Sequence, residues 1–406
     1  MVLPDSFDIN LKPSNKSMVQ GCPGVPKTYP VLVGTLEIRS GTGLPVPLES
    51  IELRFVTVDT LKNKPHREIP VSLRKVNYET KYPINDRVIS VDIPFTIGIK
   101  NDIGPTAESA KFGSTTHKLE ATAISTGTKN NVKTFEFPVV ITTYDTLPLY
   151  RQFNEPISRV VDSKDTHVMV EYSLPSSAIG PGEDLVINTK ISTNPTSKKL
   201  ADRVKLKKIT MEIVEIFDCR CDRSFIKEAL IAQKSQDYDG LYLGVKGFSN
   251  QFSITFNPNR NNKYSLFLKH QDPKLLTKVQ QTHPTNDLKP LIIERQQNPI
   301  PLTHHQPLTK RSNYFSTYYE LRVKCKFSHA KDVEIQQPIT IAPFDRVKSI
   351  HLLKWILKES EMASEFLRKI EKELGKISYD NNFDTLVYPQ RKMSKMRSKD
   401  DRERFQ

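Results

Sequence analysis

The residues of this chain that could take part in catalysis do not form a recognisable reactive set. The 406-residue sequence holds no G-x-x-x-x-G-K-[ST] phosphate loop, no G-x-S-x-G nucleophile turn and no H-E-x-x-H zinc motif. Cys219 and Cys221 form a C-x-C pair, but a closed zinc site needs four ligands, and no second cysteine pair or histidine cluster accompanies them. We therefore expect a protein that is not an enzyme and that binds no metal and no cofactor.

One short segment has the composition of a peptide that another protein binds. Leu147, Pro148, Leu149 and Tyr150 follow the LPxY pattern, a variant of PPxY. WW domains bind such segments because a preformed polyproline conformation costs little further ordering, while aromatic grooves hold the proline and the tyrosine. Leu147, Pro148 and Tyr150 are therefore candidate contacts for a WW-domain protein. The alternative is structural, with Leu147, Leu149 and Tyr150 packed where one half of the chain meets the next.

A second candidate binding site is a run of basic residues near the middle of the chain: Lys198, Lys199, Arg203, Lys205, Lys207 and Lys208. Adjacent cations bind phosphate groups cooperatively, so this run is suited to anionic lipid headgroups or to the acidic tail of a partner protein. The alternative is an ordinary solvated loop and strand face. The net charge of +14 and the pI near 9.4 agree with attraction to acidic surfaces. Nucleic acid is not an expected partner, because no zinc finger, aromatic RNP pair or helix-turn-helix accompanies the charge.

The composition sets the expected compartment and the number of domains. Four cysteines are too few for a disulfide framework, no run of about 18 apolar residues occurs, and the first residues lack the apolar core of a signal peptide. These features predict a cytoplasmic protein. A chain of 406 residues exceeds what one hydrophobic core usually supports, so we expect two domains.

Strict alternation of apolar and polar residues predicts β-strands over most of the chain. In the first half, residues 1–155, the pattern predicts an antiparallel sandwich, with a β-bulge at Gly34 where the apolar phase changes. Pro94, within a long alternating run, suggests an edge or a bulge. Residues 165–343 predict a second sandwich, interrupted by a Gln- and Pro-rich insertion, 270–311, which we expect to be flexible.

The end of the chain has a different periodicity. Apolar residues recur every three or four positions from Ala363 to Ile377, which predicts an amphipathic helix over residues 345–378 with Asp345 as its N-cap. The remaining segment, residues 389–406, is a predicted basic tail.

These segments together resemble a known family. "PVLVGTLEIRSGTGLPVPLESIELRFVTV" is similar to the start of an arrestin N-terminal lobe, and "HKLEATAISTGTKNNVKTFEFPVVI" to its closing hairpin. "VEYSLPSSAIGPGEDLVINTKISTNPTSKKLADRVKLKKITMEIVEI" resembles the opening of an arrestin C-terminal lobe. The resemblance covers roughly residues 5–343. The expected fold class is all-β, with two tandem antiparallel β-sandwiches followed by one long C-terminal helix.

Within the arrestin clan the chain looks most like the fungal arrestin-related trafficking adaptors, the alpha-arrestins. The resemblance implies two partners, plasma-membrane transporters or receptors and a HECT-class ubiquitin ligase with WW domains, and a position on the plasma membrane or endosomes. Anionic lipids of the inner leaflet are a further expected partner. The chain departs from the usual adaptor pattern because it contains no PPxY. Two other functions therefore stay open: a subunit of a sorting coat, like the arrestin-shaped subunit of retromer, or a developmental or signalling scaffold that recruits no ligase.

Overall fold

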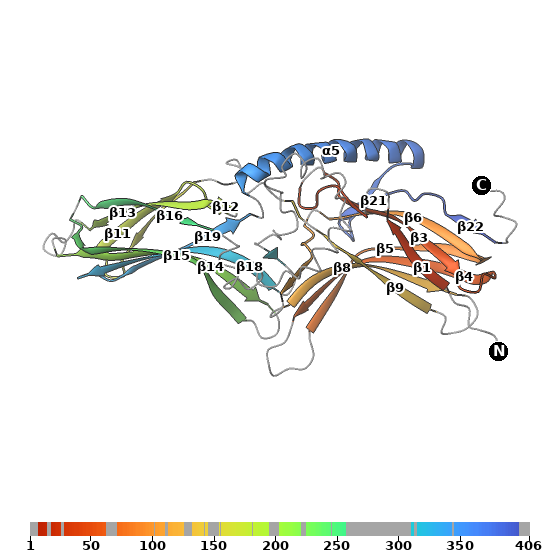
Figure 1. Ribbon diagram of the computed structural model, residues 1–406, viewed down its shortest axis with the longest axis horizontal. Helices are drawn as coiled ribbons and strands as arrows, with labels where there is room; N and C mark the ends of the chain where they lie inside the picture. Colours follow the sequence, from red (N-terminus) through yellow and green to blue (C-terminus); the bar gives the residue numbers. More distant parts are fainter. Residues whose placement is uncertain are drawn as a thin grey trace.

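The computed structural model consists of two β-sandwich lobes in series, with one long helix lying across them (Figure 1). The predicted all-β fold class, two antiparallel sandwiches followed by a C-terminal helix, is confirmed. The structure describes residues 7–13, 18–25, 28–61, 71–100, 102–109, 113–125, 132–141, 143–144, 154, 156–180, 182–194, 203–220, 225–244, 246–256, 310–311, 315–342 and 345–397.

The first lobe pairs a sheet built around β3 with a sheet built around β4. The first sheet contains β1 (Phe7–Pro13), β2 (Val19–Gln20), β3 (Val31–Ser40), β6 (Ser90–Gly98), β20 (Ser378–Asp380), β21 (Thr385–Val387) and β22 (Ser394–Met396). The second contains β4 (Val46–Leu61), β5 (Val71–Val88), β7 (Ala107–Ser109), β8 (Gly113–Ile124) and β9 (Val132–Val139). The strand pairs of both sheets are antiparallel.

The second lobe has the same two-layer plan. Its smaller sheet contains β10 (Ile157–Asp162), β11 (Val168–Leu174), β13 (Asp184–Thr193) and β16 (Phe248–Thr255). Its larger sheet contains β12 (Ala178–Ile179), β14 (Lys205–Cys219), β15 (Phe225–Tyr242), β17 (Lys310–Arg311), β18 (Phe315–Ser328) and β19 (Val333–Ile341). The short β12 pairs with β19 in parallel.

Each lobe encloses its own core, formed by the inward-facing residues of the alternating strands. On β4, Ile51, Leu53 and Phe55 are completely buried, while the intervening Glu52 and Arg54 are only partly covered. This is the pattern of a strand with one face on the core and the other toward solvent. Two separate clusters of buried apolar side chains, one in each lobe, follow from the same alternation.

The predicted bulge at Gly34 is wrong. The pairing of β3 with β1 and with β6 runs through Gly34 without a shift in register. The apolar phase changes because Val31 and Val33 face the long helix on the outside of the sheet, whereas Leu36 faces the core. Gly34 itself is required on the inner face, because a Cβ there would lie 2.8 Å from the ring of Phe95.

The long helix, α5 (Arg346–Leu374), begins on the second lobe. A carboxylate oxygen of Glu183 accepts the backbone N–H of Arg346 at 2.6 Å, and the other accepts the Arg346 guanidinium at 2.5 Å. The same guanidinium donates to Ser176 and to the carbonyl of Ala178, both at 2.9 Å. The first turn of the helix contains no acidic residue, so Glu183 of the second lobe supplies the capping charge.

The second half of α5 packs on the first lobe. Ile370 forms a buried cluster with Val31 of β3 and with Tyr388, which follows β21. The lobes also meet directly, where Leu61 at the end of β4 packs among the second-lobe residues Phe217 and Phe315. The helix therefore connects two bodies that already share an apolar contact.

The chain beyond α5 returns to the first lobe. After the β20–β21 hairpin, Val387 pairs with Ile97 of β6, and β22 pairs with the other end of β6. The Lys395 ammonium donates to the carbonyl of Ile84, which ties this segment to the opposite sheet. Residues 389–397, assigned from the sequence to a basic tail, are thus part of the first sandwich, and the tail assignment requires correction for them.

Residues 398–406 and nearly all of the predicted 270–311 insertion lie outside the described residues, except for β17. The predicted helix, 345–378, is longer than α5 because its last residues, from Gly375 on, leave the helix and lead into β20.

Candidate functional site

Four turns meet at the end of the second lobe that lies farthest from the first lobe (Figure 1). We call this region the second-lobe tip and define it by the described residues 162–167, 203–207, 242–244, 246 and 326–332. The backbone N–H of Lys331 donates to the carboxylate of Asp165 at 2.7 Å, which joins two of the turns. Leu243 donates to the carbonyl of Val204 at 3.3 Å and joins the other two. Strand pairing of Lys205 with both Tyr242 and Ser328 completes the assembly.

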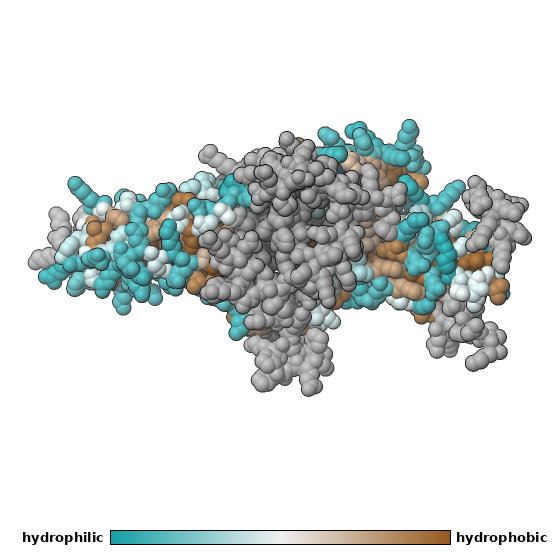
Figure 2. Space-filling view, viewed as in Figure 1, coloured by the Kyte–Doolittle hydropathy of each residue, from teal (hydrophilic) through white to brown (hydrophobic). Residues whose placement is uncertain are grey.

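The tip carries an excess of positive charge. Its lysines and arginines are Lys164, Arg203, Lys205, Lys207, Lys246, Lys326 and Lys331, and its acidic residues are Asp162, Asp165 and Asp332. The balance is 7 − 3 = +4 over the described tip residues. Six of the seven basic residues are exposed, and Lys205 is partly covered. Figure 2 shows this end of the molecule as mainly hydrophilic in the view drawn.

Two of the three tip carboxylates help to hold the turns in place. Burial alone would raise the pKa of Asp165, but the Ser163 hydroxyl and the backbone N–H groups of Lys331 and His167 donate to its carboxylate and lower the pKa below its ordinary value. Asp332 accepts the backbone N–H of Phe327 at 3.1 Å. The acids therefore fix the loops that present the lysines to solvent.

An aromatic side chain accompanies the cations. The Lys205 ammonium lies 4.2 Å from the centre of the Tyr242 ring, and the Tyr242 side chain is 62% exposed. Leu241 beside it is 37% exposed. Exposed tyrosine next to lysine is typical of surfaces that meet the headgroup region of a membrane, because the ring suits the interface and the ammonium the phosphates.

The structure divides the basic cluster expected from the sequence. Arg203, Lys205 and Lys207 belong to the tip, while Lys198 and Lys199 lie outside the described residues. Lys208 is paired with Asp237 of β15 at 3.4 Å and is thus partly neutralised.

Sequence reasoning missed the other four cations of the tip, which are Lys164, Lys246, Lys326 and Lys331. They come from three separate segments of the tip: Lys164 and Lys246 each lie on a turn, and Lys326 and Lys331 lie on either side of the turn that follows β18. The only signal in the sequence was the recurrence of lysine at predicted strand ends.

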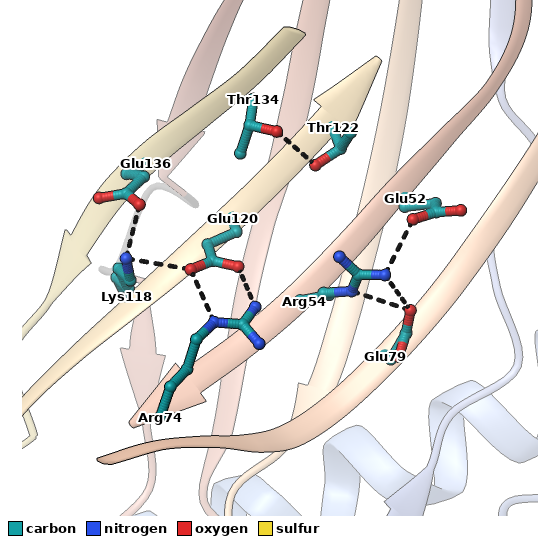
Figure 3. A network of polar contacts seen from close by, with 9 residues as sticks. All are labelled: Glu52, Arg54, Arg74, Glu79, Lys118, Glu120, Thr122, Thr134 and Glu136. Carbon is teal, nitrogen blue, oxygen red and sulfur yellow. Dashed lines mark hydrogen bonds and ion pairs between the residues drawn. The ribbon is translucent and has the colours of Figure 1, made fainter. Parts of the chain in front are cut away.

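A second charged region lies on the outer face of the first lobe, across β4, β5, β8 and β9 (Figure 3). Arg54 is held between Glu52, at 3.0 Å, and Glu79, at 2.7 Å. Farther along, Lys118 reaches Glu120 at 3.0 Å and Glu136 at 2.5 Å. Each cation has at least one carboxylate within reach, so the opposite charges largely cancel. We call this set of paired residues the charge lattice: Glu52, Arg54, Arg74, Glu79, Lys118, Glu120 and Glu136.

Glu120 is the most enclosed member of the charge lattice. Its side chain is 8% exposed and pairs with both Arg74 and Lys118. Burial alone would raise the pKa of Glu120, but these two cations lower it below its ordinary value of 4.5. The charge lattice is thus a stabilising feature of the sheet, with little charge left for a partner.

Comparison with known proteins identifies the lobe that carries the tip. Residues 164–344 match the family model of the arrestin (or S-antigen) C-terminal domain. The chain is also similar to "RHO1 GEF localizing protein 1" of Saccharomyces cerevisiae, with 26% identity over 449 aligned positions. That alignment covers 94% of this chain and 90% of the relative. Residues 164–344 thus match an arrestin C-terminal domain, and the chain as a whole is similar to a fungal relative. The match to the C-terminal domain places the tip on an arrestin lobe, and the recognised family resemblance is confirmed.

The structure describes few of the remaining candidate residues. Leu147, Pro148 and Tyr150 lie outside the described residues, as does Cys221. Cys219 is completely buried in the apolar contact between the lobes. Within the ranges that the structure describes, no three metal-ligating side chains come together, and no helix combines the length and apolar character of a membrane span.

Proposed function

We propose that this arrestin-related protein is a non-catalytic adaptor that holds a partner protein at the cytoplasmic face of a membrane. The observation that carries the proposal is the end-to-end alignment with a relative whose name states that it localises a RHO1 GEF. The proposed partner is accordingly a guanine nucleotide exchange factor of the Rho class.

The second-lobe tip supports a membrane as the place of action. A lysine near an anionic bilayer surface contributes about 1 kcal/mol, so several exposed cations on one rigid end provide usable affinity. Exposed Tyr242 adds an interfacial contact. The tip lies at the opposite end of the molecule from the first lobe, which leaves the remaining surfaces free for a protein partner (Figure 1).

Recruitment to vesicles tests both halves of this proposal. The purified exchange factor is incubated with liposomes of phosphatidylcholine and phosphatidylserine, with and without the full chain, and sedimented. We expect the exchange factor to sediment only when the chain is present and only with the anionic vesicles. If the chain sediments with the anionic vesicles but the exchange factor stays in solution, the proposed partner is rejected. If the chain itself does not sediment, the proposed membrane contact is rejected.

A second proposal follows from the LPxY segment and from the alpha-arrestin resemblance. In it the adaptor links a plasma-membrane transporter or receptor to a HECT-class ubiquitin ligase, and so promotes ubiquitin-dependent endocytosis and sorting at the plasma membrane or endosomes. Leu147, Pro148 and Tyr150 would contact the WW domain. Capture by isolated WW domains of the wild-type chain, but not of Tyr150→Ala, is the expected result. Equal capture of both would remove the motif, and unchanged surface levels of all transporters after deletion of the gene would remove the sorting role.

A further inference from the structure

A small apolar cavity lies between α5 and the outer face of the first lobe. Its volume is about 160 Å³. The helix contributes Phe366, Ile370 and Leu374, and the sheet contributes Val33 and Pro94. Figure 2 shows apolar residues gathered beneath α5 and over the strands of the first lobe.

The cavity exists because β6 lacks a continuous neighbour on one side. In the described part of the chain, β22 pairs with β6 only as far as Asp92, and β21 pairs with it only at Ile97. Pro94 lies in the gap and has no backbone N–H to offer to a partner strand. The connecting residues 388–393 therefore pass the gap without pairing, and three of them, 389–391, line the cavity.

The wall formed by residues 389–391 is held firmly. Tyr388 is 1% exposed and packs with Ile370 and Phe366. The hydroxyl of Tyr82 donates to the side-chain carbonyl of Gln390 at 3.1 Å, and the Gln390 amide donates to the carbonyl of Tyr388 at 3.3 Å. The cavity thus does not depend on a loose loop and is present before any ligand arrives.

The size of the cavity selects one kind of occupant. An apolar cavity of about 150 Å³ that is lined by Leu, Ile and Phe stays dry and binds benzene. The present cavity has nearly this volume, and its walls combine apolar side chains with Thr35, Thr96 and the polar residues Gln390 and Arg391. It can therefore take one aromatic ring, whereas a whole acyl chain or a nucleotide would not fit.

The charge at the opening of the cavity limits the kind of occupant further. Arg391 lines the cavity, and Arg391 and the next residue, Lys392, are exposed. Neither forms an ion pair or hydrogen bond with another described residue. A carboxylate beside the inserted ring would meet these cations, because charge-assisted pairs to arginine are among the stronger polar contacts.

We propose that the cavity beneath α5 is a docking site for an aromatic side chain, carried by an acidic peptide segment of a partner protein. The ring enters between Phe366 and Val33, and acidic neighbours contact Arg391 and Lys392. The site is on the first lobe and does not depend on the proposed membrane contact of the second-lobe tip. It supplies a specific protein contact on the part of the molecule that the membrane contact leaves free.

Methyl NMR on the full chain tests the proposal with two probes. The isoleucine and leucine methyl groups are labelled, and the probes are benzene and a short acidic peptide with one central phenylalanine. We expect both probes to shift the signals of Ile370 and Leu374, and the same peptide with alanine in place of phenylalanine to shift neither. Binding of benzene without binding of the peptide would overturn the proposal, as would equal binding of the alanine peptide.

Two variants separate the apolar contact from the charge contact. Thr96→Phe fills the cavity, since Thr96 is one of its walls, and should abolish binding of both probes. Thr116→Phe, the same change at an exposed position of β8, is the matched control and should leave binding unchanged. Arg391→Glu leaves the apolar walls intact, so it should weaken binding of the peptide by about tenfold and leave binding of benzene unchanged. Peptide binding that survives both Thr96→Phe and Arg391→Glu would place it elsewhere and overturn the proposal.

Discussion

The charge lattice of the first lobe and the second-lobe tip contain similar kinds of residues and have opposite properties. In the charge lattice the cations and carboxylates alternate across neighbouring strands, so that Arg54 and Lys118 each contact two acids. At the tip, Lys164, Arg203, Lys246 and Lys331 lie on turns, and Lys205, Lys207 and Lys326 lie at strand ends. None of these cations forms an ion pair with another described residue. Charged residues in the middle of a sheet face are neutralised here by cross-strand pairing, whereas charges gathered on turns and strand ends remain available to a partner.

Charge reversal at the tip should have the largest effect on binding. In the triple variant Lys164→Glu, Lys246→Glu and Lys331→Glu, we expect affinity for liposomes containing phosphatidylserine to fall by about 100-fold, because each lysine contributes about 1 kcal/mol. Cosedimentation at several salt concentrations measures this, and wild-type binding should weaken as salt rises.

The matched control reverses three exposed lysines elsewhere: Lys75→Glu, Lys227→Glu and Lys358→Glu. The net charge changes by the same amount. An equal loss of liposome binding in the control would show that only total charge matters. The tip would then have no special role in membrane binding.

Loss of a carboxylate from the charge lattice should affect stability and leave membrane binding alone. We expect Glu120→Gln to lower the free energy of unfolding by about 2 kcal/mol near neutral pH, because Arg74 and Lys118 lose a charged partner. Urea denaturation gives this value, and liposome binding by the folded variant should equal that of the wild type. A variant as stable as the wild type would contradict the stabilising role of the charge lattice.

The pH dependence of the same variant has a definite sign. The folded-state pKa of Glu120 is lowered, so its contribution is fully present above the ordinary value of 4.5 and is lost as pH falls through the folded-state pKa. The difference in unfolding free energy between wild type and Glu120→Gln should therefore be constant near neutral pH and shrink below pH 4.5. A difference that grew on acidification would contradict the assigned ion pairs.

The aromatic residue of the tip should have a smaller effect than the cations. Replacing Tyr242 by Ser removes a ring that is 62% exposed and that lies over the Lys205 ammonium. We expect a loss of about fivefold in affinity for anionic liposomes, since an interfacial ring contributes of the order of 1 kcal/mol. Surface plasmon resonance on captured vesicles resolves such a change, and a Tyr242→Phe variant with wild-type affinity would confirm that the ring is responsible.

The smallest expected effect distinguishes a paired lysine from an unpaired one. Lys208 contacts Asp237, whereas Lys164 lies exposed on a turn of the tip. Lys164→Glu should therefore reduce liposome affinity by about threefold more than Lys208→Glu does. The same vesicle assay compares them, and a larger loss for Lys208→Glu would contradict the assignment of the tip as the contact surface.

The alternation of residue types along the chain determined the two sandwiches, because period-two patterning fixes which face of a strand is buried. Ile51, Leu53 and Phe55 could be assigned to a core from the sequence for that reason. The same pattern was misleading at Gly34, where Val31 and Val33 face α5 and not the core. Amphipathic periodicity likewise predicted α5 but could not name the surface that the helix covers.

Only the tertiary structure decided which distant residues became neighbours. It joined Lys164, Lys246 and Lys331 at one tip, placed Glu183 at the start of α5, and returned residues 394–396 to the first lobe as β22. Such contacts depend on long-range pairing and on the directions in which turns leave their strands, and neither is encoded by the local spacing of residue types. The sequence by itself therefore determined the two sandwiches, the buried face of strands such as β4 and the total charge, whereas the packing of the lobes decided where that charge is free to act.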